Sequence, residues 1–293
     1  MINKKQNASK PWQFDLEEYI RQGEPGKTEK SYAWKTAIGL QDVDGLETSQ
    51  YLLETAKEHI EGTIDIATAR NRIDQYYECR REREEDEQET EEADRVAARI
   101  AEVLGEKTFQ FSPAEFIMIH KRLFSGIYHH AGMLRTYNIT KKEWVLQGET
   151  VLYASADSIK ATLEYDFSRE KEFSYQGLPL AEAVRHLAKF TSDIWQIHPF
   201  CEGNTRTTAV FMIKYLKTFG FSISNDAFAD HSWYFRNALV RANYNHLEKR
   251  IHATTEYLEY FFENLLLGAQ HELKNRYLVV NGEKIFQSPP MVL

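Results

Sequence analysis

The nine residues His198–Arg206, His-Pro-Phe-Cys-Glu-Gly-Asn-Thr-Arg, separate two segments that have the hydrophobic spacing of helices. Apolar residues recur three and four positions apart over residues 184–195 and again over residues 210–216. Pro199 prevents the first helix from continuing undisturbed, because proline lacks an amide proton and its ring clashes with the preceding turn. Gly203 permits backbone angles that other residues avoid. The pattern predicts two helices joined by a tight loop.

The start of the second helix combines groups that suit phosphate chemistry. The first N–H groups of a helix have no helical acceptor and favour an anion. Asn204 and Arg206 add side-chain donors, and the arginine fork fits phosphate oxygens. Glu202 suits a Mg²⁺ ion that bridges phosphates, and His198 suits a general base for a hydroxyl nucleophile because its pKa lies near neutrality. Together these groups predict phosphoryl or nucleotidyl transfer.

At these positions the chain resembles the Fic family, whose motif is HxFx(D/E)GNxRxxR, whereas this sequence reads HPFCEGNTRTTA. The matching positions are His198, Phe200, Glu202, Gly203, Asn204 and Arg206. Two further segments are similar to the family, Leu123–Thr136 and Trp233–Leu239, and the similarity spans roughly residues 95–270.

The resemblance implies an all-α core with a short β-hairpin flap that moves AMP from ATP onto a Ser, Thr or Tyr hydroxyl. The partner would be a protein substrate, which includes the chain itself. In this scheme His198 deprotonates the hydroxyl, Glu202 holds Mg²⁺, and Phe200 anchors the loop in the core. The expected nucleotide-binding residues are Gly203, Asn204, Thr205, Arg206, Tyr234 and Asn237.

Residues 144–153 are predicted to form the flap. Two short β-prone runs flank Gln147-Gly148-Glu149, which is typical of a hairpin. The resemblance implies that this hairpin lays a target segment beside the site by strand pairing. The expected flap residues are Val151, Leu152 and Tyr153.

The chain departs from the family motif at its second arginine, because that position is Ala209. In the family this arginine engages the γ-phosphate of ATP, so the anchor for the leaving pyrophosphate is weakened here. Thr205 also stands where glycine is commonest. Alternatives to adenylyl transfer therefore stay open: transfer of another nucleotide or of a phosphate group, or an ATP-binding regulatory module with weakened catalysis.

A second resemblance concerns restraint of the enzyme. Fic proteins are often inhibited by a helix with the motif (S/T)xxxE(G/N), and Ile60-Glu61-Gly62 matches its end, although Lys57 occupies the Ser/Thr position. Glu61 is therefore expected to approach Arg206 or to bind donors of the phosphate site. The alternative is an ordinary helix terminus capped by glycine.

Composition and pattern predict four parts of the chain: a loosely ordered arm over residues 1–30, a helical and autoinhibitory segment over residues 31–92, the Fic domain over residues 93–270, and a tail over residues 271–293. The highly charged run 80–92 is interpreted as a solvated helix face, with a partner-binding acidic stripe as the alternative.

The formal charge of −8 disfavours nucleic acid as the main partner, because nucleic-acid binders usually carry a basic surface. Cys79 and Cys201 suggest neither a disulfide framework nor a zinc site. No apolar run approaches the roughly 20 residues of a membrane span, and no signal peptide is recognisable. The expectation is a cytoplasmic protein without membrane partners, and a homo-oligomer remains compatible with the sequence.

Overall fold

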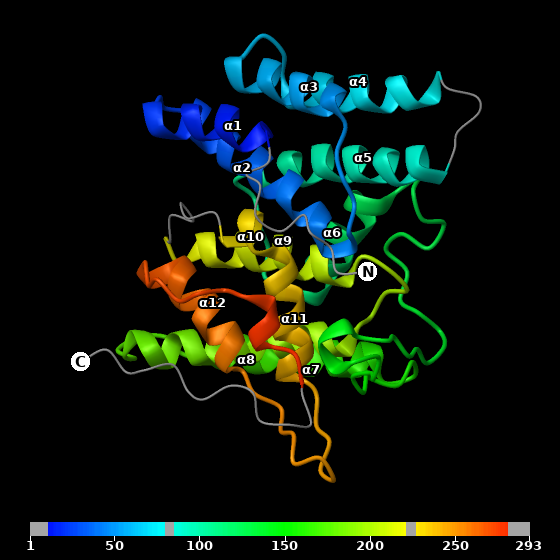
Figure 1. The fold of residues 1–293 in the computed structure, drawn as a ribbon, viewed down its shortest axis with the longest axis vertical. Helices are drawn as coiled ribbons and strands as arrows, with labels where there is room; N and C mark the ends of the chain where they lie inside the picture. Colours follow the sequence, from blue (N-terminus) through cyan, green and yellow to red (C-terminus); the bar gives the residue numbers. More distant parts are fainter. Residues whose placement is uncertain (1–10, 80–84, 221–226, 281–293) are drawn as a thin grey trace.

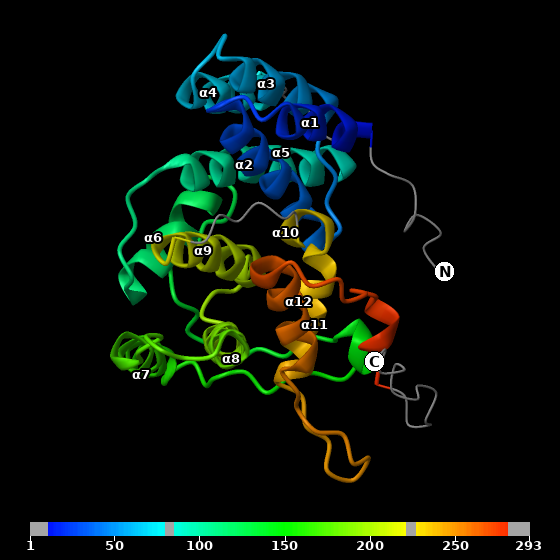
Figure 2. The same cartoon turned by 90° about the vertical axis from the view of Figure 1, so that its left-hand side faces the viewer.

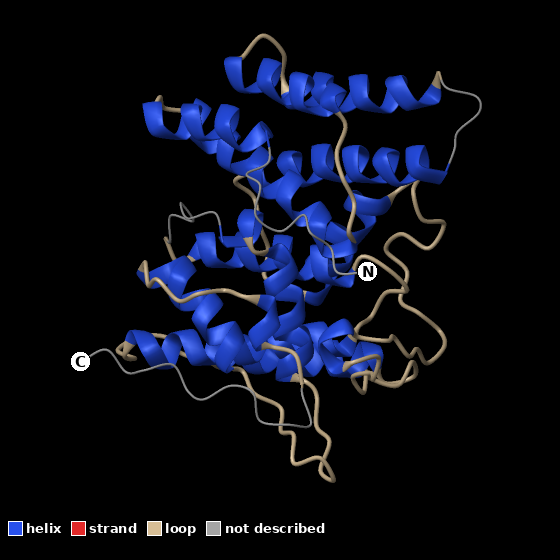
Figure 3. Ribbon diagram, viewed as in Figure 1, coloured by secondary structure: helices blue, strands red, loops and turns tan. Residues whose placement is uncertain are grey.

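Helices provide nearly all the regular structure of the protein in the computed structural model, which describes residues 11–79, 85–220 and 227–280 (Figure 3). Within these ranges no β-strand is present, and one isolated β-bridge joins His246 to Ile251. The predicted all-α fold class is therefore confirmed. Among the same residues, no helix combines the length and the apolar character needed to cross a bilayer.

The described α-helices are, in chain order, α1 (Pro11–Gln22), α2 (Lys27–Gly39), α3 (Gln50–Glu61), α4 (Ile66–Glu78), α5 (Glu85–Gly105), α6 (Pro113–Phe124), α7 (Ile159–Glu172), α8 (Leu180–Ile197), α9 (Asn204–Thr218), α10 (Ala227–Asp230), α11 (Ser232–Ala242) and α12 (Glu256–Leu267). Short 3₁₀ helices are η1 (Leu40–Asp44), η2 (Trp144–Leu146) and η3 (Asn275–Tyr277).

The helices are stacked so that α9 lies at the middle of the molecule. Figures 1 and 2 both place α3 and α4 at one end and α7 and α8 at the other, with α2, α5, α6 and α9 between them. Helices α11 and α12 pack against each other and against α8. The N-terminus of α9 therefore has the N-terminal helices on one side and α8 with the loop 137–155 on the other.

An aromatic cluster fixes α9 against its neighbours. Phe211 of α9 lies 5.4 Å from Phe116 of α6 and 5.3 Å from Phe167 of α7, measured between ring centroids. Phe167 in turn lies 5.8 Å from Phe190 of α8. Burying each large apolar side chain stabilises the fold by about 1.5–3 kcal/mol. This packing therefore holds α9 in a fixed position at the end of the loop that precedes it.

The N-terminal and C-terminal parts are more ordered than the composition predicted. Where a loose arm was expected over residues 1–30, residues 11–22 form α1, because Leu16 and Tyr19 lie on one face and are buried against the core. In the predicted tail, Leu278 is fully buried. Residues 1–10, 80–84 and 281–293 of these predicted segments lie outside the described residues.

The hairpin predicted over residues 144–153 is not confirmed. Residues 144–146 instead form η2, which ends at Gln147 in the left-handed conformation. Val145 and Leu146 are adjacent and both buried, whereas the side chains of a strand point alternately to opposite faces. The carbonyl of Val145 accepts a hydrogen bond from the amide of Val280, at 2.8 Å, so it is paired with the C-terminal segment.

Candidate active site

Helix α8 ends at His198 in a conformation that is unusual for a residue with a side chain. His198 has φ 48° and ψ 58°, in the left-handed region that glycine normally occupies at a helix C-terminus. This geometry costs roughly 1–2 kcal/mol for an L-residue. Strained backbone of this kind often occurs at functional sites, because the surrounding structure must hold it in place.

The His198 imidazole is buried without a hydrogen-bond partner. Its ring centroid lies 4.3 Å from that of Tyr153 and 5.3 Å from that of Trp195, and the residue is 4% exposed. Neither ring nitrogen has a hydrogen-bond partner among the described residues. Burial, and next the charge of Lys141, hold the pKa of His198 well below its ordinary value. The ring is therefore neutral at pH 7 and can accept a proton.

Asn204 shapes the loop after His198. Its side-chain oxygen accepts from the Phe200 amide at 3.0 Å, and its side-chain nitrogen donates to the Phe200 carbonyl at 2.8 Å. Gly203 has φ +75°, and a Cβ atom there would lie 2.4 Å from the Phe124 ring. Asn204 was expected to hold phosphate, but both ends of its amide are engaged with the loop backbone.

His120 of α6 ties this loop to the segment that follows α6. Its Nδ1 accepts from the Gly132 amide at 2.9 Å, so Nε2 carries the proton and donates to the Glu202 carbonyl at 3.0 Å. Its ring stacks on Phe200 with a centroid distance of 3.7 Å. Burial lowers the pKa of His120 to about 4, which keeps this tautomer neutral.

The N-terminus of α9 has backbone donors without a side-chain cap. Its cap residue is Gly203, and no side chain of the described residues caps the helix. The first N–H groups of α9 lack helical acceptors and carry the positive end of the helix dipole. The Thr205 hydroxyl accepts from the Trp195 indole at 2.9 Å, which fixes it beside these groups.

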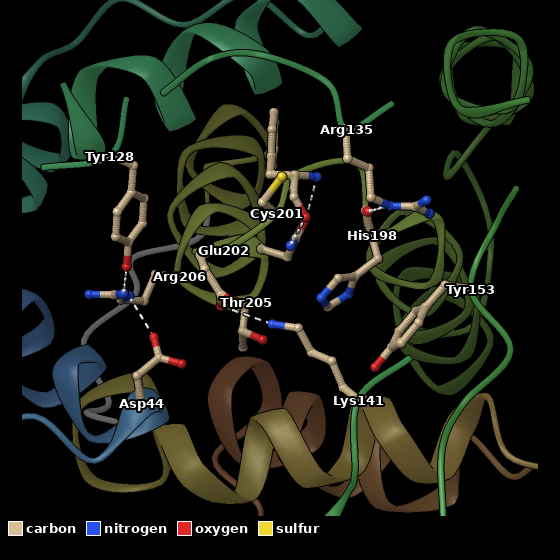
Figure 4. Close-up of polar contacts among 12 residues, drawn as sticks. Asp44, Tyr128, Arg135, Lys141, Tyr153, His198, Cys201, Glu202, Thr205 and Arg206 are labelled. Atoms are coloured by element: carbon tan, nitrogen blue, oxygen red, sulfur yellow. Dashed lines mark hydrogen bonds and ion pairs between the residues drawn. The ribbon is translucent and has the colours of Figure 1, made fainter. Parts of the chain in front are cut away.

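Arg206 is committed to other protein groups. It is 1% exposed. Burial alone would lower the pKa of Arg206, but Asp44 and the other oxygen groups around it raise that pKa above its ordinary value. The resemblance predicted phosphate contact, whereas this guanidinium binds oxygen atoms of η1, of α5 and of the loop after α6. Two of those partners are Asp44 at 2.9 Å and Tyr128 at 3.2 Å (Figure 4). The other two are Glu92 at 2.6 Å and Gln41 at 3.0 Å.

Glu61 does not approach Arg206, contrary to the expectation from the inhibitory motif. Its carboxylate accepts from Lys27 at 2.8 Å and from the Tyr19 hydroxyl, and Lys27 is the main cause that lowers the pKa of Glu61. Figures 1 and 2 show why, since α3 lies in the outermost layer and α9 in the middle. The glycine cap is observed, with Gly62 at φ 82°.

Glu202 lies in the loop before α9, is largely exposed and is paired with Lys141. The Lys141 ammonium is 2.9 Å from the Glu202 carboxylate, whose side chain is 55% exposed (Figure 4). A single carboxylate beside an anion site fits Mg²⁺, because this ion commonly binds one or two carboxylates plus substrate phosphates and water. Among the described residues, no group of three or more His, Cys, Asp or Glu could form a ready-made metal cage.

The predicted flap residues lie beside His198 as an extended loop. Val151 and Tyr153 are buried, and Leu152 is 83% exposed. The Tyr153 hydroxyl donates to Glu143 at 3.2 Å, and Glu143 binds Arg236 of α11 at 2.7 Å. This chain of contacts connects His198, through Tyr153, to α11.

Arg135 joins the same loop to the end of α8. Its guanidinium donates to the carbonyls of His198 and Tyr137, each at 2.8 Å, of Ile197 at 3.2 Å, and of Ala154. Because four backbone carbonyls bind one rigid cation, His198 and the loop hold a fixed position relative to each other.

Tyr234 and Asn237, predicted for the nucleoside pocket, lie on the buried side of α11. Tyr234 is 1% exposed and Asn237 is fully buried. Asn237 donates to Asn275 at 2.8 Å, and its own carbonyl oxygen has no hydrogen-bond partner in the described part of the chain. A buried amide oxygen of this kind suits a donor on a ligand, so their nucleotide role stays a prediction.

Several residues of the site were not predicted from sequence. Arg135 and Arg236 lie in the two segments that resemble the Fic family, so a signal existed at both positions. Lys141 is one of two consecutive lysines in a polar stretch, and Asp44 belongs to a segment far from the motif. Neither carries a pattern that reveals its contact with the site.

Comparison with known proteins finds a family match over the site. Residues 110–216 match the model of the Fic/DOC family. The chain is also similar to the protein adenylyltransferase VbhT of Bartonella schoenbuchensis, at 28% identity over 108 residues. That match covers 37% of this chain and spans 21% of the length of VbhT.

Two solved structures are similar to this chain. A Fic family protein from Desulfovibrio desulfuricans covers 89% of this chain and 73% of its own, with a TM-score of 0.53 and 15% identity. The N-terminal Fic domain of an effector protein from a Bartonella species, described as a substrate of the VirB secretion system, covers 53% of this chain and 71% of its own, with a TM-score of 0.39 and 21% identity.

Proposed function

Residues 110–216 carry a Fic/DOC domain, and from this premise we propose that the chain is a protein adenylyltransferase that moves AMP from ATP onto a protein hydroxyl. The observation that carries the proposal is the buried His198 imidazole, unpartnered at both nitrogens among the described residues, close to the uncapped N-terminus of α9. The similarity to VbhT, named a protein adenylyltransferase, supports the same reaction class.

In the proposed reaction His198 accepts the proton of a Ser, Thr or Tyr hydroxyl at a free ring nitrogen. The hydroxyl oxygen forms a bond to the α-phosphorus of ATP, the bond between the α- and β-phosphates breaks, and pyrophosphate leaves. The N–H groups at the start of α9 stabilise charge on the phosphate oxygens. Glu202 would hold Mg²⁺, which supplies further neutralisation of the phosphates.

The engagement of Arg206 by Asp44 and Glu92 favours a second candidate function. A nucleotide-binding regulatory module with weakened catalysis does not need a free arginine at the phosphates. Here Arg206 is paired with carboxylates, and position 209 is an alanine, which has no charge. Transfer of another nucleotide or of phosphate is the remaining alternative. These candidates differ in which part of ATP becomes attached to protein.

The test is label transfer with Mg²⁺ and ATP labelled at either the α- or the γ-phosphate. Adenylyl transfer predicts covalent label from the α-phosphate alone, lost in His198→Ala although that variant still binds ATP. The matched control is His252→Ala, which removes an exposed histidine and should label like the parent. Label from the γ-phosphate alone would indicate a phosphotransferase, and bound ATP without transfer would favour the regulatory module.

A further inference from the structure

In the described part of the chain, the basic side chain at the start of α9 is already paired with carboxylates. This inference rests on the proposed function, because it concerns how a nucleoside triphosphate is held. In its first two turns α9 supplies one basic side chain, Arg206, and Ala209 one turn later is fully buried. Arg206 is bound to the carboxylates of Asp44 and Glu92, so this group of three carries a net negative charge. A second cationic side chain near the start of α9 would offset this charge when phosphates bind.

Other nearby cations are engaged with buried groups. Arg135 donates to four backbone carbonyls, and Arg236 binds Glu143, whose side chain is 1% exposed. Moving either guanidinium would leave buried polar groups unpaired, which costs about 1–3 kcal/mol for each neutral group. Neither is therefore free to follow a ligand.

Lys141 is placed differently. Its partner in the site is Glu202, and the two side chains are 29% and 55% exposed. Figure 4 shows its ammonium directed toward Glu202 and Thr205, with the His198 ring nearby. After burial, Lys141 is the largest cause that lowers the pKa of His198, which agrees with this proximity.

We propose that the Lys141 ammonium binds the phosphate chain of the nucleotide. A partly exposed ion pair such as Lys141–Glu202 contributes only modestly to stability, so Lys141 can exchange the carboxylate for a phosphate oxygen at small cost. Its flexible four-carbon stem and compact charge suit a ligand whose phosphates are not held by a rigid fork. Because Lys141 comes from the loop 137–155, this contact also couples nucleotide binding to the loop beside His198.

The test measures affinity for ATP and for adenosine by calorimetry in the presence of EDTA, so that no metal and no catalysis is involved. Lys141→Ala should weaken ATP binding about tenfold, which corresponds to one charge-assisted hydrogen bond at a partly exposed site. Adenosine binding should be unchanged. Lys142→Ala is the matched control, because it removes the same charge from the exposed neighbouring residue and should leave both affinities unchanged.

A purely structural role for the ion pair makes a different prediction. If Lys141 only holds the loop through Glu202, Glu202→Gln should weaken ATP binding as Lys141→Ala does. If Lys141 contacts the phosphates instead, Glu202→Gln should tighten ATP binding in the absence of metal. The reason is that this substitution removes a negative charge beside the phosphates. Circular dichroism of each variant confirms folding, and Lys141→Arg should restore ATP affinity. If Lys141→Ala binds ATP with the same affinity as the parent, this inference is wrong and the proposed function still stands. If the parent itself binds neither ATP nor adenosine, both the inference and the proposed function are wrong.

Discussion

His198 and His120 are buried histidines with opposite hydrogen bonding. Both ring nitrogens of His120 are used, one by the Gly132 amide and one by the Glu202 carbonyl. Neither ring nitrogen of His198 has a partner in the described residues. The first arrangement ties the loop to its neighbours, and the second leaves both nitrogens of His198 available to a ligand, as the proposed role of a base requires. The same type of side chain is therefore fully hydrogen-bonded at one position and unpartnered at the other because its surroundings differ.

The pKa of His198 predicts the pH dependence of transfer. If His198 is the base of the proposed transfer, it must be neutral. Burial holds its pKa well below 6.5, so the neutral form persists as the pH falls through that value. Single-turnover transfer rates should be nearly constant between about pH 8 and pH 6 and should decline only in more acid solution. A half-maximal rate near pH 6.5 would show that the imidazole titrates like an exposed histidine and would contradict this expectation.

At the scale of elements, the junction of α8, the loop and α9 depends on close packing at Gly203. The glycine has φ +75°, and the Phe124 ring occupies the space of a Cβ atom. Phe124 is itself fully buried. The ring cannot move aside without disturbing the core, so the position excludes any side chain.

Gly203→Ala should therefore be much more destabilising than alanine at an open glycine. Gly148→Ala is the control, because Gly148 has φ +90° but a Cβ atom there would meet nothing within 4 Å. We expect a loss of about 1 kcal/mol at Gly148 from backbone strain, and about 2–4 kcal/mol at Gly203 from strain and overpacking together. Urea unfolding of the two variants measures the difference, and equal losses would show that Phe124 yields.

Helical spacing and the motif together predicted this junction, because both are local in sequence. The same spacing could not reveal that Val145 and Leu146 turn inward together, since a short apolar run also suits a strand. Their burial depends on contacts with distant segments such as Val280. The positions of Lys141 and Asp44 were unpredictable for the same reason, because their partners are brought close only by the fold.

At the scale of the whole molecule, the N-terminal segment is part of the core. Trp34 and Leu40 are fully buried, and a Cβ atom at Gly39 would lie 2.2 Å from the Ala229 carbonyl oxygen. Ser232 donates to the Gly39 carbonyl at 2.8 Å. Because the end of α2 touches the backbone of α10, deleting this segment would expose core surface. Its influence on the site is better tested by single substitutions.

Asp44 and Glu61 allow such a comparison, because both are acidic residues of the N-terminal segment and only Asp44 contacts Arg206. Binding of phosphate by Arg206 requires the guanidinium to leave its carboxylates. Asp44→Asn preserves the shape of the side chain and removes one charge, so ATP binding should tighten several-fold while stability falls by about 1 kcal/mol.

Glu61→Gln should leave ATP affinity unchanged, since its carboxylate is paired with Lys27 at the surface of α3. Titration calorimetry with ATP and urea unfolding provide both readouts for the two variants. Tighter binding in Glu61→Gln with no change in Asp44→Asn would restore the motif-based expectation. It would also mean that α3 reaches the site in a different arrangement of the N-terminal helices. If only Asp44→Asn tightens ATP binding, the affinity for ATP is limited by the contact between Asp44 of η1 and Arg206 in the first turn of α9.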